Sequence, residues 1–206
     1  MSNAKVSNKN QLKLVKLAQL AVLVALIVLF SFTGLGYIKV GVIEITLNVI
    51  PVAVGAIVLG PVGGAVCGAV FGLTSFIQCF GLSSFGAALL AISPVRTFVT
   101  AFVTRVLEGL ITGFIFMAFK NHKNVGCAVS SICCPLLNTV LFIGSFILLF
   151  QHSEFFTNLY SQSGSTNIIK FVAWFCGLNG ALEIVACFII ATAVSKALLE
   201  LNKRLK

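Results

Sequence analysis

Ionisable residues inside long apolar stretches are the side chains of this sequence best placed to do chemistry. Arg105 and Glu108 are three residues apart, and Glu183 lies in a later apolar stretch. Residues three apart share one face of a helix. Charged groups are costly to bury in a membrane, so they mark either an internal cluster or a ligand site. The sequence favours a structural charge cluster of Arg105, Glu108 and Glu183 over direct contact with a substrate.

Arg96 differs from this cluster because the sequence offers it no obvious carboxylate partner. It follows Ser93 and Pro94 at the predicted outer end of its stretch, where a planar guanidinium can bind a carboxylate through two hydrogen bonds. We therefore predict that Arg96 contacts an anionic substrate. Residues at a matching depth complete the predicted substrate-binding set: Asn48, Gln78, Asn138, Asn179 and Trp174, the last with a membrane-interface anchor as its alternative role.

Motifs for hydrolysis or metal binding are absent from the sequence. It contains no H-E-x-x-H, no G-x-S-x-G and no G-x-x-x-x-G-K-[ST] phosphate loop. His122 and His152 are predicted on opposite sides of the membrane, and the seven cysteines are irregularly spaced. We therefore expect no enzyme, no metal, no cofactor and no hydrolysis of ATP by this chain. A membrane-embedded hydrolase would need a nucleophile–base pair, and none is recognisable.

The elements that position these residues are predicted to be membrane-spanning helices. Of 206 residues, 59% are hydrophobic and 9% are charged, whereas soluble domains carry roughly a quarter charged residues. The uncharged runs 17–38, 45–95 and 124–153 each exceed the roughly 20 apolar residues that cross a bilayer as a helix. The first run is also longer than the roughly 7–15 apolar residues of a cleaved signal peptide.

The placement of the basic residues predicts the orientation. Most of the 14 Lys and Arg lie at the N-terminus, in the loop with Lys120 and Lys123, or at the C-terminal end. Cytoplasmic loops carry such an excess of positive charge. Both termini are therefore predicted in the cytoplasm, the number of spans is even, and the net charge of +9 is not read as a nucleic-acid surface. We expect the plasma membrane as the location.

We predict an all-α membrane protein, with a single domain over residues 1–206 and short outward loops. Gly60 and Pro61 split the longest uncharged run and leave a short second span. Residues 37–46 mix β-branched residues with Gly, which favours a small hairpin in the first loop. The six predicted spans are 12–36, 47–60, 62–78, 93–119, 125–150 and 167–198.

Small residues recur at helical spacing in two places. Gly60, Gly64, Gly68 and Gly72 are four apart, which forms a groove for a neighbouring helix. We interpret this groove as internal packing. In the first span the small residues are Ala18, Ala21 and Ala25.

Several segments resemble the S component, the substrate-binding subunit, of an energy-coupling factor (ECF) vitamin transporter. The resemblance covers nearly the whole chain. It implies a six-helix protein that binds a vitamin or precursor outside, docks on a T component driven by two cytoplasmic ATPases, and topples in the membrane to release the substrate. The docking feature of that family, Ala-x-x-x-Ala on the first span, matches Ala21 and Ala25. The similar segments are Ile-Pro-Val-x-x-Gly-Ala-Ile-x-Leu-Gly-Pro (50–61), Phe-Gly-Leu-Thr-Ser (71–75), Ser-Pro-x-Arg (93–96), Asn-Thr-Val-Leu-Phe (138–142) and Asn-Gly-Ala-Leu-Glu (179–183).

Within that family, the chain is most similar to the pantothenate branch. The similarity lies in Ile-Thr-x-x-x-Ile-Pro-Val (45–52) and in Asn138 and Thr139, whereas Asn48 stands where that branch is expected to have a His. The riboflavin, folate and hydroxymethylpyrimidine or thiazole branches share the fold and remain alternatives. A stand-alone secondary transporter and a structural or assembly factor are the alternatives from other classes.

Overall fold

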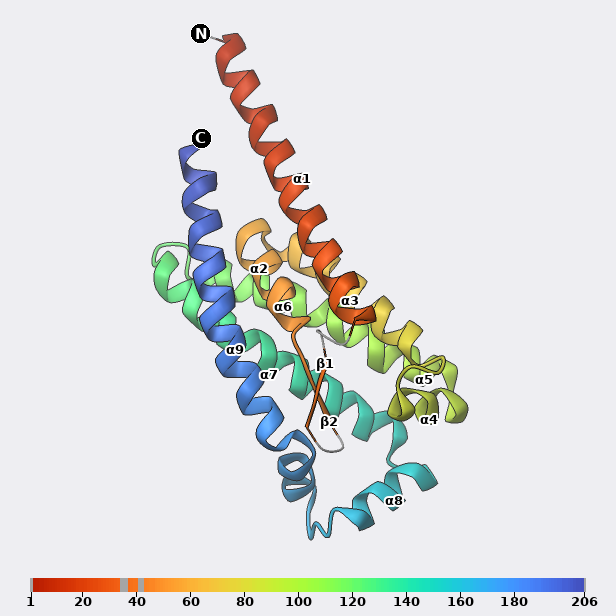
Figure 1. Ribbon diagram of the computed structural model, residues 1–206. Coiled ribbons are helices and arrows are strands. Elements are labelled where there is room, and N and C mark those ends of the chain that lie inside the picture. Colours follow the sequence, from red (N-terminus) through yellow and green to blue (C-terminus); the bar gives the residue numbers. More distant parts are fainter. Residues whose placement is uncertain (1, 34–36, 41–42, 206) are drawn as a thin grey trace.

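The computed structural model describes the backbone of residues 2–33, 37–40 and 43–205, and their side chains except at 2–9, 37–40, 43–45, 178 and 179. The end of the first predicted span, residues 34–36, lies outside the described residues. In chain order the elements are α1 (Ser2–Phe32), β1 (Tyr37–Val40), β2 (Ile43–Thr46), α2 (Val49–Leu59), α3 (Pro61–Gln78), α4 (Ser84–Ile92), α5 (Pro94–Phe98), the π-helix η1 (Val99–Val103), α6 (Thr104–Ala118), α7 (Lys123–Phe150), α8 (Glu154–Gln162) and α9 (Ile168–Arg204) (Figure 1).

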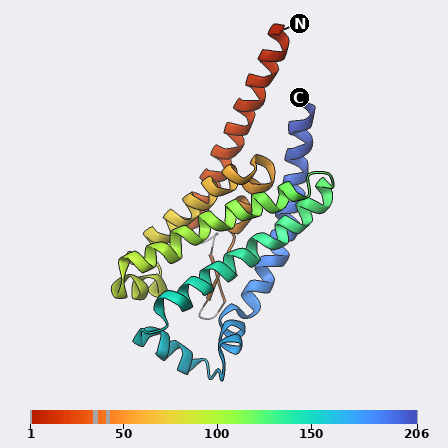
Figure 2. The same cartoon turned by 180° about the vertical axis from the view of Figure 1, so that it is seen from behind.

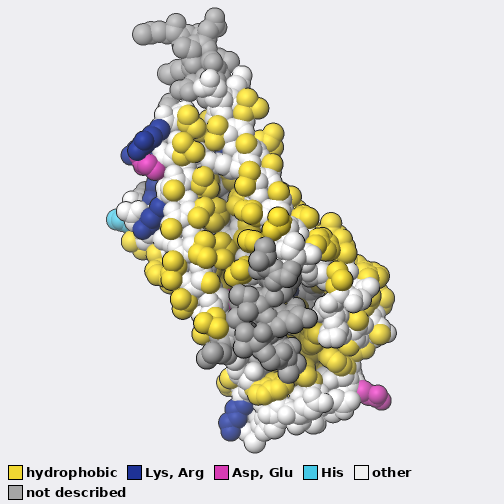
Figure 3. All heavy atoms as spheres, viewed as in Figure 1, with side chains coloured by type: hydrophobic (Ala, Val, Ile, Leu, Met, Phe, Trp, Pro, Cys, Tyr) yellow, Lys and Arg dark blue, Asp and Glu magenta, His cyan; other side chains and the backbone are white. Residues whose placement is uncertain are grey.

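Long apolar helices dominate the fold. Within the described ranges, five helical segments are long and apolar enough to cross a bilayer. Hydrophobic side chains cover most of the face drawn in Figure 3, as contact with lipid requires. The five segments are Asn10–Phe32, Pro61–Gln78, Pro94–Ala118, Lys123–Phe150 and Gly180–Arg204.

The predicted second span, residues 47–60, is not a long helix. It corresponds to α2, which has 11 residues, and at about 1.5 Å per residue it covers roughly half of a ~30 Å hydrocarbon core. Nearly all of α2 is buried, including Val52 and Ile57, because α1, α3, α6, α7 and α9 surround it. The described residues therefore hold five helices long enough to cross a bilayer around one short core helix, and the sixth predicted span corresponds to this short helix.

The last predicted span, residues 167–198, is interrupted. Gly177 has φ 46° and ψ −144° inside α9, a backbone conformation that glycine tolerates because it has no Cβ. The break separates the short apolar segment Ile168–Gly177 from the long segment Gly180–Arg204. The N-terminal part of α9, Ile168–Gly177, is therefore a separate helical piece.

Both termini lie at the same end of the molecule (Figures 1 and 2). The side chains of Gln19, midway along α1, and Asn202 near the end of α9 exchange two hydrogen bonds of 3.0 and 3.2 Å. Near the C-terminal end of α1, Ser31 Oγ donates to Thr74 Oγ1 of α3 at 2.8 Å. These bonds fix the second half of α1 against its neighbours.

The loop for which the sequence favours a hairpin holds β1 and β2. The two strands pair antiparallel, with Tyr37 opposite Thr46 and Val40 opposite Ile43. Strand β2 contacts α9 and leads within three residues into α2. The hairpin therefore connects α1 to the core helix and touches the last span.

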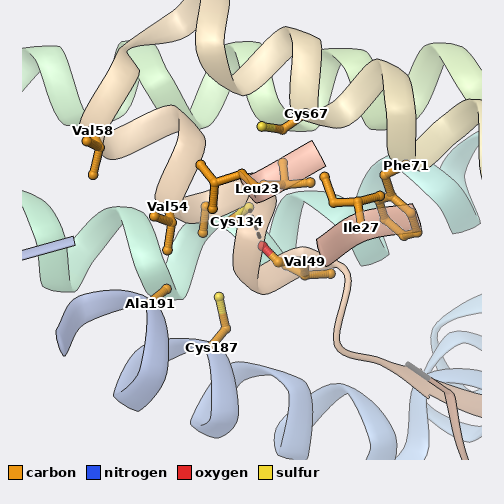
Figure 4. Close-up of a cluster of buried hydrophobic side chains, with 12 residues drawn as sticks. Leu23, Ile27, Val49, Val54, Val58, Cys67, Phe71, Cys134, Cys187 and Ala191 are labelled. Carbon is orange, nitrogen blue, oxygen red and sulfur yellow. Dashed lines mark hydrogen bonds between the residues drawn. The ribbon is translucent and has the colours of Figure 1, made fainter. Parts of the chain in front are cut away.

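Two apolar clusters fill the bundle. The first surrounds α2 and combines Leu23 and Ile27 of α1 with Val49, Val54 and Val58 of α2, closed by side chains of α3, α7 and α9 (Figure 4). The second lies toward the other end and is rich in phenylalanine. Its buried members are Leu89, Ile143, Phe146, Phe150, Phe156, Phe171 and Phe175.

Helices α3 and α6 pack backbone against backbone. A Cβ added at Gly68 would collide with the carbonyl oxygen of Arg105, and one added at Gly64 would collide with that of Gly109. A Cβ at Gly72 would lie 2.8 Å from the Cα of Phe102. The glycine repeat thus packs the protein's own interior, and it brings the backbone of α6 directly against α3.

We expect Gly68→Ala to destabilise the protein, because the new methyl group must push the α6 backbone away. Overpacking of this kind typically lowers the free energy of unfolding by about 1–3 kcal/mol. Thermal unfolding in detergent measures the effect. Gly144→Ala is the matched control, because a Cβ there meets nothing within 4 Å. Equal unfolding midpoints for the two variants would show that α6 can withdraw from α3 freely.

Candidate substrate-binding cavity

A cavity of about 480 Å³ lies in the half of the bundle remote from the termini. Cavities of roughly 300–1,000 Å³ are typical of small-molecule sites. Its walls come from the ends of α1 and α3, from α4 and η1, and from α6, α7 and α9. The polar and charged lining residues used below are Ser31, Thr46, Gln78, Thr100, Arg105, Asn138 and Glu183.

Arg105 supplies the positive charge of the cavity. Only 8% of its surface is exposed. Its Nη1 donates to the carbonyl oxygen of Thr100 at 3.1 Å and to Oγ1 of Thr104 at 3.0 Å. The guanidinium also lies over two rings, 4.4 Å from the centroid of Phe142 and 5.3 Å from that of Phe71. Cation–π contact and hydrogen bonds together hold a charge that is costly to bury.

The π-helix η1 positions this arginine. A π-helix accommodates an extra residue within a helical turn and is often found at functional sites. Here it ends two residues before Arg105, and the carbonyl oxygen of Thr100 within it accepts from both Thr104 Oγ1 and Arg105 Nη1. Thr97, Thr100 and Ala101 line the same cavity. The irregular turn therefore presents a backbone oxygen to the guanidinium.

Glu183 supplies the negative charge. It is 8% exposed and lines the cavity from α9. Its Oε1 accepts a hydrogen bond of 2.8 Å from the backbone N–H of Thr46, the last residue of β2. This bond attaches the hairpin to α9 at the wall of the cavity. A ligand would therefore meet a guanidinium and a carboxylate on different helices of the same site.

Asn138 adds a neutral acceptor. Its side chain is 7% exposed, and its Oδ1 has no hydrogen-bond partner among the described residues. Leaving a buried acceptor unmatched costs roughly 1–3 kcal/mol. The amide oxygen is therefore suited to receive a hydroxyl or an N–H of a bound molecule.

A hydrogen-bonded network supports the α1 and α3 wall. The amide of Gln78 donates to the carbonyl oxygen of Ser31. Asn48 Nδ2 donates to Ser31 Oγ at 3.1 Å, and Ser31 Oγ donates to Thr74 Oγ1. Gln78 and Ser31 line the cavity, whereas Asn48 is fully buried behind them. The network fixes the end of α1 as one side of the site.

Aromatic rings form the apolar part of the wall. Phe85 of α4, Phe142 of α7 and Phe175 of α9 all line the cavity. The ring centroid of Phe85 lies 6.2 Å from that of Phe142 and 5.8 Å from that of Phe175. The site thus combines a charged, hydrogen-bonding part with an apolar one.

The six residues that the sequence predicts as substrate-binding are distributed over several environments. Gln78 and Asn138 line the cavity, and Asn48 lies one layer behind it. Arg96 is exposed and donates from Nη1 to the carbonyl oxygen of Leu149 at 3.1 Å. Neither Arg96 nor Trp174, which is 41% exposed, is among the described lining residues. The side chain of Asn179 lies outside the described residues.

The three residues of the predicted charge cluster interact electrostatically with one another, and two of them face the cavity. Arg105 and Glu183 line the cavity. Glu108 is fully buried outside the cavity lining, and its Oε1 accepts from the thiol of Cys134 at 3.3 Å.

The sequence does not predict the cavity-lining residues Phe85, Phe142 and Phe175. No spacing in the sequence singles out these three among its 19 phenylalanines.

Ala21 and Ala25 lie on the outer surface of α1. Both are exposed, whereas Leu23 and Ile27 of the same helix are buried against α2 and α3. The two alanines therefore do not pack the core of this chain. They leave a shallow strip on which another helix can approach closely.

These features define a multi-pass membrane protein with an internal cavity of about 480 Å³. Residues 15–195 match the family model described as "ECF transporter, substrate-specific component". Because this match covers most of the chain, the protein belongs to the family of ECF transporter S components. That is a family of substrate-specific transport subunits and not of enzymes.

Two curated proteins are similar to the chain over most of their lengths. The pantothenate transporter PanT of Leuconostoc mesenteroides subsp. mesenteroides is 26% identical over 179 residues, which are 82% of this chain and 84% of that protein. The pantothenic acid transporter PanT of Lactococcus lactis subsp. cremoris is 30% identical over 163 residues, which are 74% and 76% of the two chains.

Proposed function

We propose that this S component binds pantothenate in the 480 Å³ cavity and serves its uptake into the cell. The observation that carries the proposal is the buried guanidinium of Arg105 in a cavity that also presents the acceptor of Asn138. Both similar proteins described above are named as transporters of pantothenate or pantothenic acid. Their names support the same substrate.

The chemistry of pantothenate matches the two parts of the cavity. Its carboxylate suits the fork of Arg105, because guanidinium and carboxylate form two parallel hydrogen bonds. Its hydroxyls and amide N–H can donate to Asn138 Oδ1 and to the carboxylate of Glu183. Its methyl groups can lie against the phenylalanine wall formed by Phe85 and Phe175. Arg105 therefore takes, in this proposal, the role that the sequence assigns to Arg96.

Arg96 then has a structural role. Its Nη1 donates to the carbonyl oxygen of Leu149, one residue before the end of α7. The last carbonyl groups of a helix lack partners within it, and a cation near them is favourable. Arg96 thus serves as a cap for α7 at the surface of the bundle.

We expect Arg105→Gln to weaken pantothenate binding at least about thirtyfold. Removing one member of a buried charge pair costs roughly 2–5 kcal/mol, and 1.4 kcal/mol is a factor of ten. Titration calorimetry of the purified protein in detergent measures the change. Arg96→Gln is the matched control and should keep the affinity within about twofold. Wild-type affinity in the Arg105 variant would remove it from the site and point to a different substrate.

We further propose that both termini lie in the cytoplasm and that α2, with the hairpin before it, completes a sixth crossing of the plasma membrane. The common end of the termini carries Lys13 and Lys16 of α1, Lys123 of α7, and Lys196 and Lys203 of α9. An excess of Lys and Arg marks the cytoplasmic side. The cavity, in the other half, would then open toward the outside.

A pair of tags tests this orientation. A reporter fused after Lys206 should be active only in the cytoplasm, and an epitope inserted at residues 163–165 should bind antibody on intact cells. The insertion point follows α8, and Gly164 there is exposed. Surface labelling of the C-terminal tag would contradict the proposed orientation.

The final part of the proposal concerns the partners, a T component with two cytoplasmic ATPases. Ala21 and Ala25 are the proposed docking strip, since they are exposed and one turn apart on a helix whose opposite face is buried. Small residues at this spacing let two helix backbones approach closely. Transport energy would then come from the partners through this contact.

We expect Ala21→Phe and Ala25→Phe each to abolish pantothenate uptake while leaving binding nearly unchanged. The bulky ring prevents close approach of a partner helix without touching the cavity. Uptake into vesicles that contain the complete transporter, together with binding to the isolated chain, provides the two measurements. Val140→Phe, at another exposed position in α7, is the control and should retain uptake. Loss of binding together with uptake would show that the alanines support the fold instead.

A further inference from the structure

A second hollow lies at the end of the bundle that holds the termini. It has a volume of about 160 Å³ and lies between the start of α7 and the C-terminal part of α9. One liquid water molecule occupies roughly 30 Å³, so the hollow has room for a phosphate group. The lining residues that matter for its chemistry are Lys123, Asn124, Lys196, Glu200 and Lys203.

The charges around this hollow are unbalanced. Glu200 is its one acidic member, and that carboxylate lies 4.0 Å from Lys203 Nζ and 3.7 Å from Arg204 Nε. In the described part of the chain, no carboxylate lies within 4.0 Å of Lys123 or Lys196. Figure 3 shows Lys and Arg side chains gathered with one acidic group at the edge of the molecule near this end. An anion between the helices would relieve the repulsion among the lysines.

The hollow opens at the boundary of the membrane rather than in open water. Lys123 begins one spanning segment, and Lys196 and Lys203 lie near the end of another. Exposed apolar side chains flank them, with Val125 at 51% and Leu201 at 46% exposure. Lysine stems can run along such apolar surface while their ammonium groups reach the headgroup level. The adjoining surface therefore suits acyl chains and the hollow suits a headgroup.

We propose that this hollow binds the phosphate headgroup of an anionic phospholipid in the leaflet on the side of the termini. The ammonium groups of Lys123 and Lys196 pair with the phosphate oxygens, and the amide of Asn124 donates a further hydrogen bond. Helix α7 begins here without a side-chain cap and without an acidic residue in its first turn, so its dipole adds to the positive field. Basic pockets between spans are a common form of lipid-headgroup site.

Native mass spectrometry of the purified protein tests the proposal, with phosphatidylglycerol and phosphatidylcholine of identical acyl chains as probes. The wild type should bind phosphatidylglycerol more tightly than phosphatidylcholine. The triple variant Lys123→Gln, Lys196→Gln, Lys203→Gln should bind phosphatidylglycerol at least about tenfold more weakly than the wild type. The matched variant Lys13→Gln, Lys16→Gln, Lys170→Gln loses the same charge at exposed sites elsewhere and should retain the preference. Unchanged pantothenate binding confirms that the triple variant is folded.

Three outcomes would overturn the proposal. Equal affinity of the triple variant and the wild type for phosphatidylglycerol would exclude a headgroup site in this hollow. Displacement of the lipid by millimolar inorganic phosphate would identify a site for soluble anions instead. If the triple variant kept its lipid but no longer assembled with the T component and ATPases, the lysines would belong to a protein interface.

Discussion

The close contact between α3 and α6 is the constraint on which the rest of the structure depends. Where the two helices meet, backbone touches backbone, because Gly64, Gly68 and Gly109 place no side chain between them. The carbonyl oxygen that fills the space at Gly68 belongs to Arg105, so the contact also fixes the residue that carries the charge of the cavity. Widening this contact would shift the guanidinium relative to α7 and α9, which form the other walls.

The buried arginine is tolerated because its surroundings replace water at several points. Thr100 and Thr104 accept its hydrogen bonds, and the rings of Phe71 and Phe142 face its guanidinium. These four groups are neutral, and the arginine also interacts electrostatically with the carboxylates of Glu108 and Glu183. Glu183 is held elsewhere on the cavity wall by the backbone of Thr46. The site can therefore distinguish the two ends of a polar ligand.

The sequence predicts the class of fold well because uncharged runs and clustered lysines are properties of composition and order. The sequence also marks α2 as a short segment ending at Gly60 and Pro61. It does not show that α2 is enclosed, since a fully buried helix and a lipid-facing span are both apolar.

The sequence predicts Arg96 as the substrate-binding cation, whereas the proposed function assigns that role to Arg105. This difference has its own physical cause. Depth along a helix can be counted from the sequence, and by depth Arg96 looks suitable for an external ligand. Depth does not give the direction of a side chain. The two arginines are nine residues apart, which is about two and a half helical turns, so they point to opposite faces of their helix. Gln78 on α3 and Asn138 on α7, which the sequence predicts as substrate-binding, both line the cavity.

The burial of α2 also determines how the molecule responds to the thickness of its bilayer. A helix in contact with lipid must match its apolar length to the local hydrocarbon layer, and it tilts or deforms the layer when the two differ. Helix α2 is enclosed by five other helices, so this requirement does not apply to it. A thinner or thicker membrane would tilt the outer spans, while α2 would keep its place among its protein neighbours. A difference between helix length and bilayer thickness would then change the tilt of the outer helices, while α2 stays fixed at the centre of the bundle.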